Sequence, residues 1–367
     1  MISARILIPM LVIECALLGT GLATLMAWGW ALGRIRRREP LLAEGTPRIA
    51  PWGTVTTWVV IVLFVVVQGL VLVAYLALTG PWPKGRDLTA IDQMAVSCLF
   101  NFALLLVVPP VLGLAAGFVT SLRFLGIRRE ALGRHVREGA IAFLLLAPFV
   151  YAIQTGAALI WVPKEHPLQK MVLERPSVKI AGLAFVAAVI LAPAGEELIF
   201  RGVLQTWLSG LFLRRALKRR RAIARENDRA DPFDETPAAI DPDGAINWYA
   251  PVPEPVAPEP KEAPALRWTR AIPIVLTSLL FALLHAPQWP APVPIFVLSL
   301  GLGVLFESTG SLVASFTTHA MLNGTSTLIL FLAMLIGQTP EGKKLLHPAK
   351  KAAPVASCAA LAVPGRD

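Results

Sequence analysis

Two adjacent carboxylates, Glu196 and Glu197, interrupt an apolar segment near the middle of the chain and are followed by Arg201. Neighbouring residues on an α-helix lie about 100° apart, whereas residues four positions apart share a face. The spacing therefore predicts a Glu197–Arg201 ion pair and leaves Glu196 to face something else. In a wet cavity, Glu196 could act as a general base or bind a metal. The alternative is an interfacial helix start at which both carboxylates cap the helix dipole.

Two histidines add to this chemistry. The chain has five, at positions 135, 166, 285, 319 and 347, and only His285 and His319 fall within long apolar runs. His319 and Asn323 are four residues apart, so a helix would place them on one face. A hydrogen-bonded core histidine and an interhelical polar pair are the alternatives for these residues. Together, one base, two imidazoles, an amide and a guanidinium suit a hydrolytic site that combines water activation with oxyanion donors.

The composition places these groups in a membrane. Hydrophobic residues make up 55% of the 367 positions, charged residues make up 16%, and the mean hydropathy is +0.63. A soluble domain carries about 25% charged residues. Three cysteines exclude a disulfide scaffold. Nucleic-acid binding is not expected, because no basic stripe is interleaved with exposed aromatic residues. The predicted fold class is an all-α polytopic membrane helical bundle.

About eight transmembrane helices are expected, since a bilayer core needs roughly 20 apolar residues per helix. The candidate runs are residues 6–32, 54–83, 93–122, 139–163, 177–213, 271–306 and 308–340. The run at 271–306 is long enough for two short helices, separated by the proline-rich stretch from Pro287 to Pro294. The run at 177–213 is too long for one ordinary span. We expect Pro193 and Gly195 to bend it, and the part after Arg201 to lie along the interface.

Basic residues indicate the orientation. They cluster after the first span, between Arg123 and Arg137, and between Arg214 and Arg225. The positive-inside rule places these three loops in the cytoplasm and both termini outside. Four lysines near the C-terminus argue mildly against an outside location for that end.

Three regions are predicted along the chain. Residues 1–176 form an N-terminal membrane region with about four spans. Residues 177–337 form a catalytic membrane core, interrupted by a cytoplasmic insertion at 226–266 that is rich in proline and acidic residues and is expected to be disordered. Residues 338–367 are expected to be a disordered tail.

The three motifs in this order resemble the CPBP family of intramembrane proteases, also called the CAAX protease and bacteriocin-processing, or Abi, family. They read Glu-Glu-x-x-x-Arg at 196–201, Phe-x-x-x-His at 281–285 and His-x-x-x-Asn at 319–323. The flanking Ala-Pro-Ala-Gly before the glutamates and Arg-Gly-Val-Leu-Gln after them also resemble the family. The likeness covers about residues 177–335. The departure from the usual pattern is the long acidic insertion between the first two motifs.

The resemblance implies proteolysis of a membrane-associated peptide or protein, in a cavity reached from the cytoplasmic side. It implies that Glu196 activates water with help from His285, and that Glu197 with Arg201 holds the helix geometry. His319 and Asn323 would stabilise the oxyanion or complete a zinc site. If one divalent metal such as zinc is used, Glu196, His285 and His319 are the candidate ligands. Catalysis by glutamate without a metal remains the alternative.

Two other classes of function stay open. A proton-coupled transporter also places Glu and His in its spans, but it needs a continuous polar pathway. A non-catalytic scaffold or immunity protein would keep the fold and be indifferent to the loss of Glu196. The expected location is the bacterial inner (cytoplasmic) membrane, as a multi-pass protein, with the lipid bilayer and a membrane-associated substrate as partners.

Overall fold

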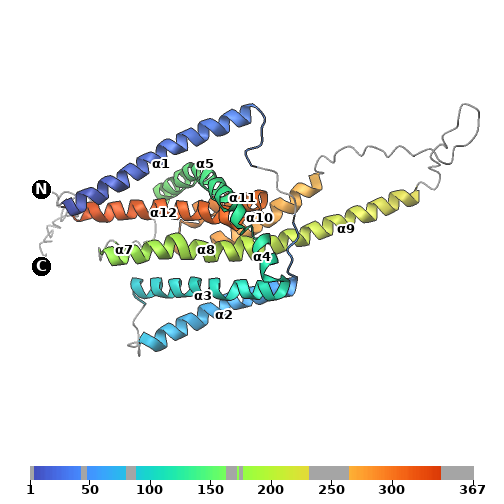
Figure 1. Ribbon diagram of the computed structural model, residues 1–367, viewed down its shortest axis with the longest axis horizontal. Helices are drawn as coiled ribbons and strands as arrows, with labels where there is room; N and C mark the ends of the chain where they lie inside the picture. The colour runs from blue at the N-terminus through green and yellow to red at the C-terminus, as the bar shows by residue number, and fades with distance from the viewer. Residues whose placement is uncertain are drawn as a thin grey trace, which may run out of the picture.

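The computed structural model describes residues 4–42, 48–79, 88–162, 172, 177–230 and 264–339, and all regular structure in these ranges is helical (Figure 1). The helices are α1 Ala4–Arg36, α2 Thr54–Thr79, α3 Ala90–Ala116, α4 Phe118–Phe124, η1 Arg129–Ala131, α5 Leu132–Ile160, α7 Val178–Phe185, η2 Val186–Leu191, α8 Ala192–Glu197, η3 Leu198–Gln205, α9 Thr206–Ala230, α10 Pro264–Leu284, η4 Ala286–Gln288, α11 Pro292–Thr309 and α12 Leu312–Gly337. The expected all-α membrane bundle is confirmed.

Seven helices within the described residues are long and apolar enough to cross a membrane. Their spans are Ile6–Arg36, Thr54–Thr79, Ile91–Ala116, Phe118–Ile160, Lys179–Arg219, Pro292–Thr309 and Leu312–Gly337. The remaining expected crossing corresponds to a shorter apolar helix, Thr269–Leu284. The proline-rich stretch separates this helix from α11, as predicted, because α10 ends at Leu284 and α11 begins at Pro292.

One long helix runs through the centre of the bundle. Segments α7, η2, α8, η3 and α9 follow each other without a break from Val178 to Ala230, and Figure 1 shows them on one line. The predicted bend at Pro193 and Gly195 is therefore wrong, and so is the interfacial course after Arg201. Two π-helical segments, η2 and η3, flank α8. The wider turn of η2 precedes Pro193 and accommodates a residue that cannot donate a backbone hydrogen bond.

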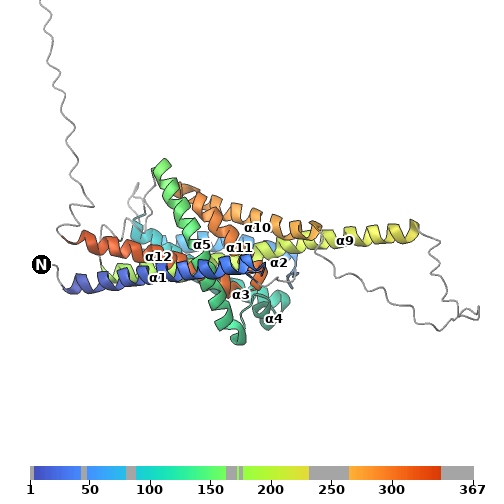
Figure 2. The same ribbon diagram turned by 90° about the horizontal axis from the view of Figure 1, so that it is seen from above.

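The central helix is enclosed by helices from both halves of the chain. In Figure 1, α12 lies along one side of it and α3, backed by α2, lies along the other. The pair α10–α11 packs against η3, and α5 crosses α11 and α12 steeply (Figure 2). Helix α1 stands apart along most of its length and is largely exposed in the isolated chain. Its apolar surface is suited to contact lipid.

The basic ends of α1 and α9 point toward the same end of the molecule, where α4 also lies (Figure 1). The basic ends of these helices therefore gather at one end of the molecule. Helix α9 continues beyond the bundle at this end, with Arg214, Arg215, Lys218 and Arg219 exposed.

The predicted insertion and tail fall largely outside the described residues. Of the insertion at 226–266, the described parts are helical: α9 extends to Ala230 and α10 begins at Pro264. Residues 231–263 and 340–367 lie outside the described residues.

Candidate active site

The predicted ion pair between Glu197 and Arg201 is present in the centre of the bundle. Arg201 Nη1 lies 3.1 Å from Glu197 Oε1, and both side chains are 1% exposed. Their burial is energetically demanding, because removing either partner would leave an unpaired charge in an apolar interior. The pair therefore holds α8 and η3 in a defined position.

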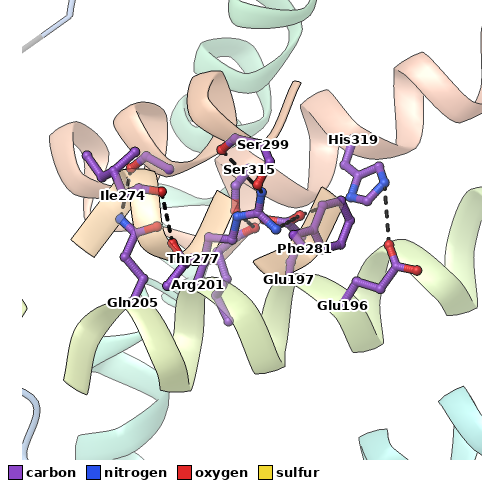
Figure 3. Close-up of polar contacts among 12 residues, drawn as sticks. Glu196, Glu197, Arg201, Gln205, Ile274, Thr277, Phe281, Ser299, Ser315 and His319 are labelled. Atoms are coloured by element: carbon purple, nitrogen blue, oxygen red, sulfur yellow. Dashed lines mark hydrogen bonds and ion pairs between the residues drawn. The ribbon is translucent and has the colours of Figure 1, made fainter. Parts of the chain in front are cut away.

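Arg201 is anchored by a residue that the sequence motifs do not contain. Its Nη2 donates to the Ser299 hydroxyl at 2.8 Å and to the Ser299 carbonyl at 3.3 Å, and Ser299 on α11 is 1% exposed. The guanidinium also lies over the ring of Phe281, 4.9 Å from its centroid. Figure 3 shows Arg201 reaching from the central helix toward Ser299. A single serine among many in the apolar runs carries no signal in the sequence.

His319 joins both glutamates. Its Nδ1 lies 2.9 Å from Glu197 Oε1, and its Nε2 lies 3.6 Å from Glu196 Oε2 (Figure 3). A carboxylate can only accept, so the Glu197 contact assigns the proton to Nδ1 and turns Nε2 toward Glu196. The imidazole is thus oriented by a buried carboxylate, in the same way that a triad carboxylate orients its histidine.

Glu196 differs from its neighbour in its surroundings. Its side chain is 28% exposed, and the contact with His319 is its ion pair among the described residues. Glu197 is occupied by Arg201 and His319, whereas Glu196 keeps an accessible carboxylate oriented toward an imidazole. This matches the requirement for a general base, which must reach a water molecule while being held in place.

His285 lies at the end of α10, one turn beyond Phe281. Its Nδ1 lies 2.8 Å from the Phe281 carbonyl, which can only accept, so Nδ1 carries the proton and Nε2 is the free nitrogen. The rings of His285 and His319 contact the same Phe281 ring, at centroid distances of 5.0 and 6.0 Å. The two histidines, which follow α10 and lie on α12, therefore share Phe281 as a neighbour.

Asn323 is on the same helix as His319, but its side chain contacts the backbone rather than a glutamate. Its Nδ2 donates to the Ala188 carbonyl of η2 at 2.9 Å. An amide nitrogen carries two hydrogens, so one donor stays available after this contact. Asn323 thereby ties α12 to the π-helical segment that precedes α8.

The N-terminal region also reaches the site. Asn101 on α3 is 7% exposed, and its Oδ1 lies so close to Gly195 that a Cβ built at that position would be 2.5 Å away. Its Nδ2 donates to the Ser97 carbonyl of its own helix at 2.9 Å. Only glycine permits this approach of α3 to the residue before Glu196. Neither Asn101 nor Gly195 is among the site residues predicted from the sequence motifs.

The candidate zinc ligands do not form a metal site in this arrangement. Within the described residues, no three His, Cys, Asp or Glu side chains are grouped so that they could hold a metal ion. Glu196 and His319 are neighbours, with His319 Nε2 3.6 Å from Glu196 Oε2, but no third such side chain joins them within those residues. Contacts thus join Glu196, Glu197, Arg201 and His319, and Phe281 links Arg201 and His319 to His285, whereas Asn323 contacts Ala188.

Comparison with known proteins adds a family. Residues 258–325 match the family model described as Type II CAAX prenyl endopeptidase Rce1-like. The matched range includes Phe281, His285, His319 and Asn323, whereas Glu196, Glu197 and Arg201 precede it. The comparisons with curated proteins and with solved structures found no match. The C-terminal part of the chain is therefore similar to the Rce1-like type II CAAX prenyl endopeptidases over residues 258–325.

Proposed function

We propose that this chain is an intramembrane endopeptidase that hydrolyses a peptide bond of a membrane-associated peptide or protein, using water activated by Glu196. The observation that carries the proposal is that the two adjacent glutamates have different surroundings. Glu197 is neutralised by Arg201 at 3.1 Å, while the accessible Glu196 faces His319 Nε2 at 3.6 Å. The family match supports intramembrane proteolysis in general.

In the proposed reaction, Glu196 takes a proton from a water molecule, and the oxygen of that water attacks the carbonyl carbon of the substrate peptide bond. The carbonyl π electrons move to the oxygen, which becomes an oxyanion. The remaining Asn323 hydrogen would donate to this charge, and His285 or His319 would donate from Nε2 in the doubly protonated imidazolium form. When the tetrahedral intermediate collapses, the C–N bond breaks and Glu196 returns the proton to the leaving nitrogen. Glu197 and Arg201 act through His319 and the helix, and no step needs a metal.

The substrate is proposed to be membrane-associated, because the catalytic groups lie between helices that are apolar enough to cross a bilayer. A location in the bacterial cytoplasmic membrane belongs to the same proposal. A scaffold or transporter would use the same polar residues without consuming a peptide bond.

The test compares membrane peptides in cells that express wild-type protein, Glu196→Gln or Glu14→Gln. The Glu14 variant is the matched control, because Glu14 is an exposed carboxylate on α1 and undergoes the same isosteric change. We expect new N- and C-termini with wild type and Glu14→Gln, and their loss with Glu196→Gln. Identical peptides in all three, with each protein folded and inserted, would reject the protease and favour a scaffold.

A further inference from the structure

A file of polar side chains runs along one face of the central helix from the candidate active site toward its basic end. Glu197, Arg201, Gln205 and Ser209 recur every four residues, and their exposed fractions are 1, 1, 0 and 6%. Residues four apart on an α-helix drift by about 40° per step. The wider π-helical turns of η3 offset this drift over Leu198–Gln205, so the polar side chains stay on one face.

A second polar series on α11 faces this file. Arg201 contacts Ser299, and Gln205 Nε2 donates to the Gly303 carbonyl at 3.0 Å and lies 3.4 Å from Glu307 Oε2. Ser299, Gly303 and Glu307 also recur every four residues. Figure 3 shows Gln205 and Arg201 one turn apart on the central helix, both oriented toward the neighbouring helices. The two series together form a polar seam between η3 and α11.

Several buried atoms of this seam lack a protein hydrogen-bond partner. Within the described residues these are Glu197 Oε2, Gln205 Oε1 and Ser209 Oγ, apart from Arg201 Nη1, which also lacks a hydrogen bond but forms the ion pair with Glu197. A buried polar atom without a partner costs about 1–3 kcal/mol, and such atoms in native proteins are usually satisfied by ordered water. Three such atoms lie in one file inside an apolar helix bundle. Ordered water molecules along the file would provide hydrogen-bond partners for all three.

We propose that this seam is a water file, which delivers the water consumed by hydrolysis from the basic end of α9 to Glu197 and the adjacent Glu196. The use of this water for peptide hydrolysis rests on the proposed function. The existence of the water file rests only on the buried polar residues of the seam. Its length from Glu197 to Ser209 is roughly 18 Å at 1.5 Å per residue. Ser209 forms the outer end, close to the exposed Arg214 and Arg215.

Gly303 is the narrow point of the file. A Cβ built there would lie 3.0 Å from Gln205 Oε1 and 2.9 Å from Ile274 Cγ2. Gly303→Ala would therefore fill the space beside Gln205 without touching Glu196 or His319. Gly301→Ala is the matched control, since it adds the same methyl group to the same helix and crowds Leu146 of α5 instead.

The first experiment detects water directly. Cysteines are introduced by Ser209→Cys and Ser299→Cys in a chain whose native cysteines, Cys15, Cys98 and Cys358, are replaced by alanine. X-ray radiolysis in ¹⁸O-labelled water then oxidises side chains that adjoin water, and mass spectrometry measures the label. Ser121→Cys is the dry control, because Ser121 is 3% exposed and donates to the Leu112 carbonyl at 3.0 Å.

We expect both seam cysteines to acquire ¹⁸O at least tenfold faster than Ser121→Cys. Adding Gly303→Ala should leave the label at Ser209→Cys unchanged and reduce it at the deeper Ser299→Cys at least tenfold. Gly301→Ala should change neither. Equal labelling of all three cysteines, or labelling of Ser299→Cys that is indifferent to Gly303→Ala, would overturn the proposed route.

The second experiment measures hydrolysis. Gly303→Ala should lower kcat at least tenfold and leave KM within twofold of wild type, because it restricts water and spares the substrate site. Gly301→Ala should keep both values near wild type. An unchanged kcat for Gly303→Ala would overturn the delivery role. Since radiolytic labelling needs no catalysis, an inactive wild-type chain with labelled seam cysteines would reject the proposed function and keep the water file.

Discussion

His319 Nδ1 and Glu197 Oε1 lie 2.9 Å apart, and this contact joins the last sequence motif to the first. The same Glu197 oxygen lies 3.1 Å from Arg201 Nη1. Glu197 therefore serves two partners and orients the imidazole toward Glu196. The two adjacent carboxylates thus have different contacts, so replacing each of them by an amide should affect the stability of the protein differently.

Glu197→Gln should destabilise the fold, whereas Glu196→Gln should not. The Glu197 change leaves the Arg201 guanidinium buried without its counter-charge, which costs about 3–5 kcal/mol. Glu196 is partly exposed, and its isosteric amide keeps the shape of the site. We would measure unfolding in detergent by denaturant titration for both variants. Equal stability of the two variants would contradict the assignment of Glu197 as the structural carboxylate.

Gly195→Ala should impair catalysis through Asn101. The added methyl group would lie 2.5 Å from Asn101 Oδ1 and displace the residue before Glu196. Since a displacement of about 1 Å can cost on the order of 10²-fold in rate, we expect kcat to fall at least tenfold. Replacing Asn101 by alanine in the same chain should restore most of the activity.

The control for this pair is Gly182→Ala on α7, where a new Cβ meets nothing within 4 Å. It should leave kcat unchanged. If Asn101→Ala and Gly195→Ala have additive effects with no rescue, α3 does not position Glu196 through this contact.

Arg48→Lys should destabilise the junction between the segment before α2 and the α11–α12 corner. Arg48 Nη1 donates to the Phe124 carbonyl at 2.8 Å, and the guanidinium stacks on the rings of Phe124 and Phe306. Burial lowers the pKa of Arg48 and the Glu307 carboxylate opposes that shift, so the group is charged at neutral pH. An ammonium cannot reproduce the planar stacking.

We expect Arg48→Lys to cost about 1–3 kcal/mol in unfolding free energy. Arg36→Lys, an exposed position at the end of α1, is the matched control and should be neutral. Thermal unfolding of the two variants in the same detergent checks this, and a neutral Arg48→Lys would show that the stacking contributes nothing.

Peptide hydrolysis should persist in the presence of 1,10-phenanthroline. In the ranges that the structure describes, Glu196, His285 and His319 are not grouped as a three-ligand site. The measurement is the rate of peptide cleavage with and without chelator, together with the metal content of the purified protein. Loss of activity that stoichiometric Zn²⁺ restores would require a different arrangement of these ligands.

The sequence allowed the membrane helices and one contact of the candidate site to be predicted. Membrane helices can be recognised because an apolar run of sufficient length has few alternatives to spanning a bilayer. The Glu197–Arg201 pair could be predicted because a spacing of four is a local property of one helix. In contrast, the course of the central helix was predicted wrongly at Pro193, since sequence rules for proline do not include a preceding π-helical turn.

Contacts between helices could not be predicted from the sequence. Ser299, Asn101 and Gly303 are ordinary residues of apolar segments, and their roles depend on which neighbour faces them. The recurrence of polar residues at 197, 201, 205 and 209 is visible in the sequence. Its significance appears only when burial is known, because a polar side chain that faces water has no need of a partner.

The sequence by itself determined that this chain is a multi-pass helical membrane protein, and it determined which side chains are costly enough in a bilayer to need an explanation. These conclusions follow from composition and from spacing along single helices. Only the tertiary structure decided that Glu196 stays accessible and faces His319 and that Ser299 anchors Arg201, because these contacts depend on α12 and α11 packing against the central helix. Helix packing is a relation between distant segments, and no local pattern contains it.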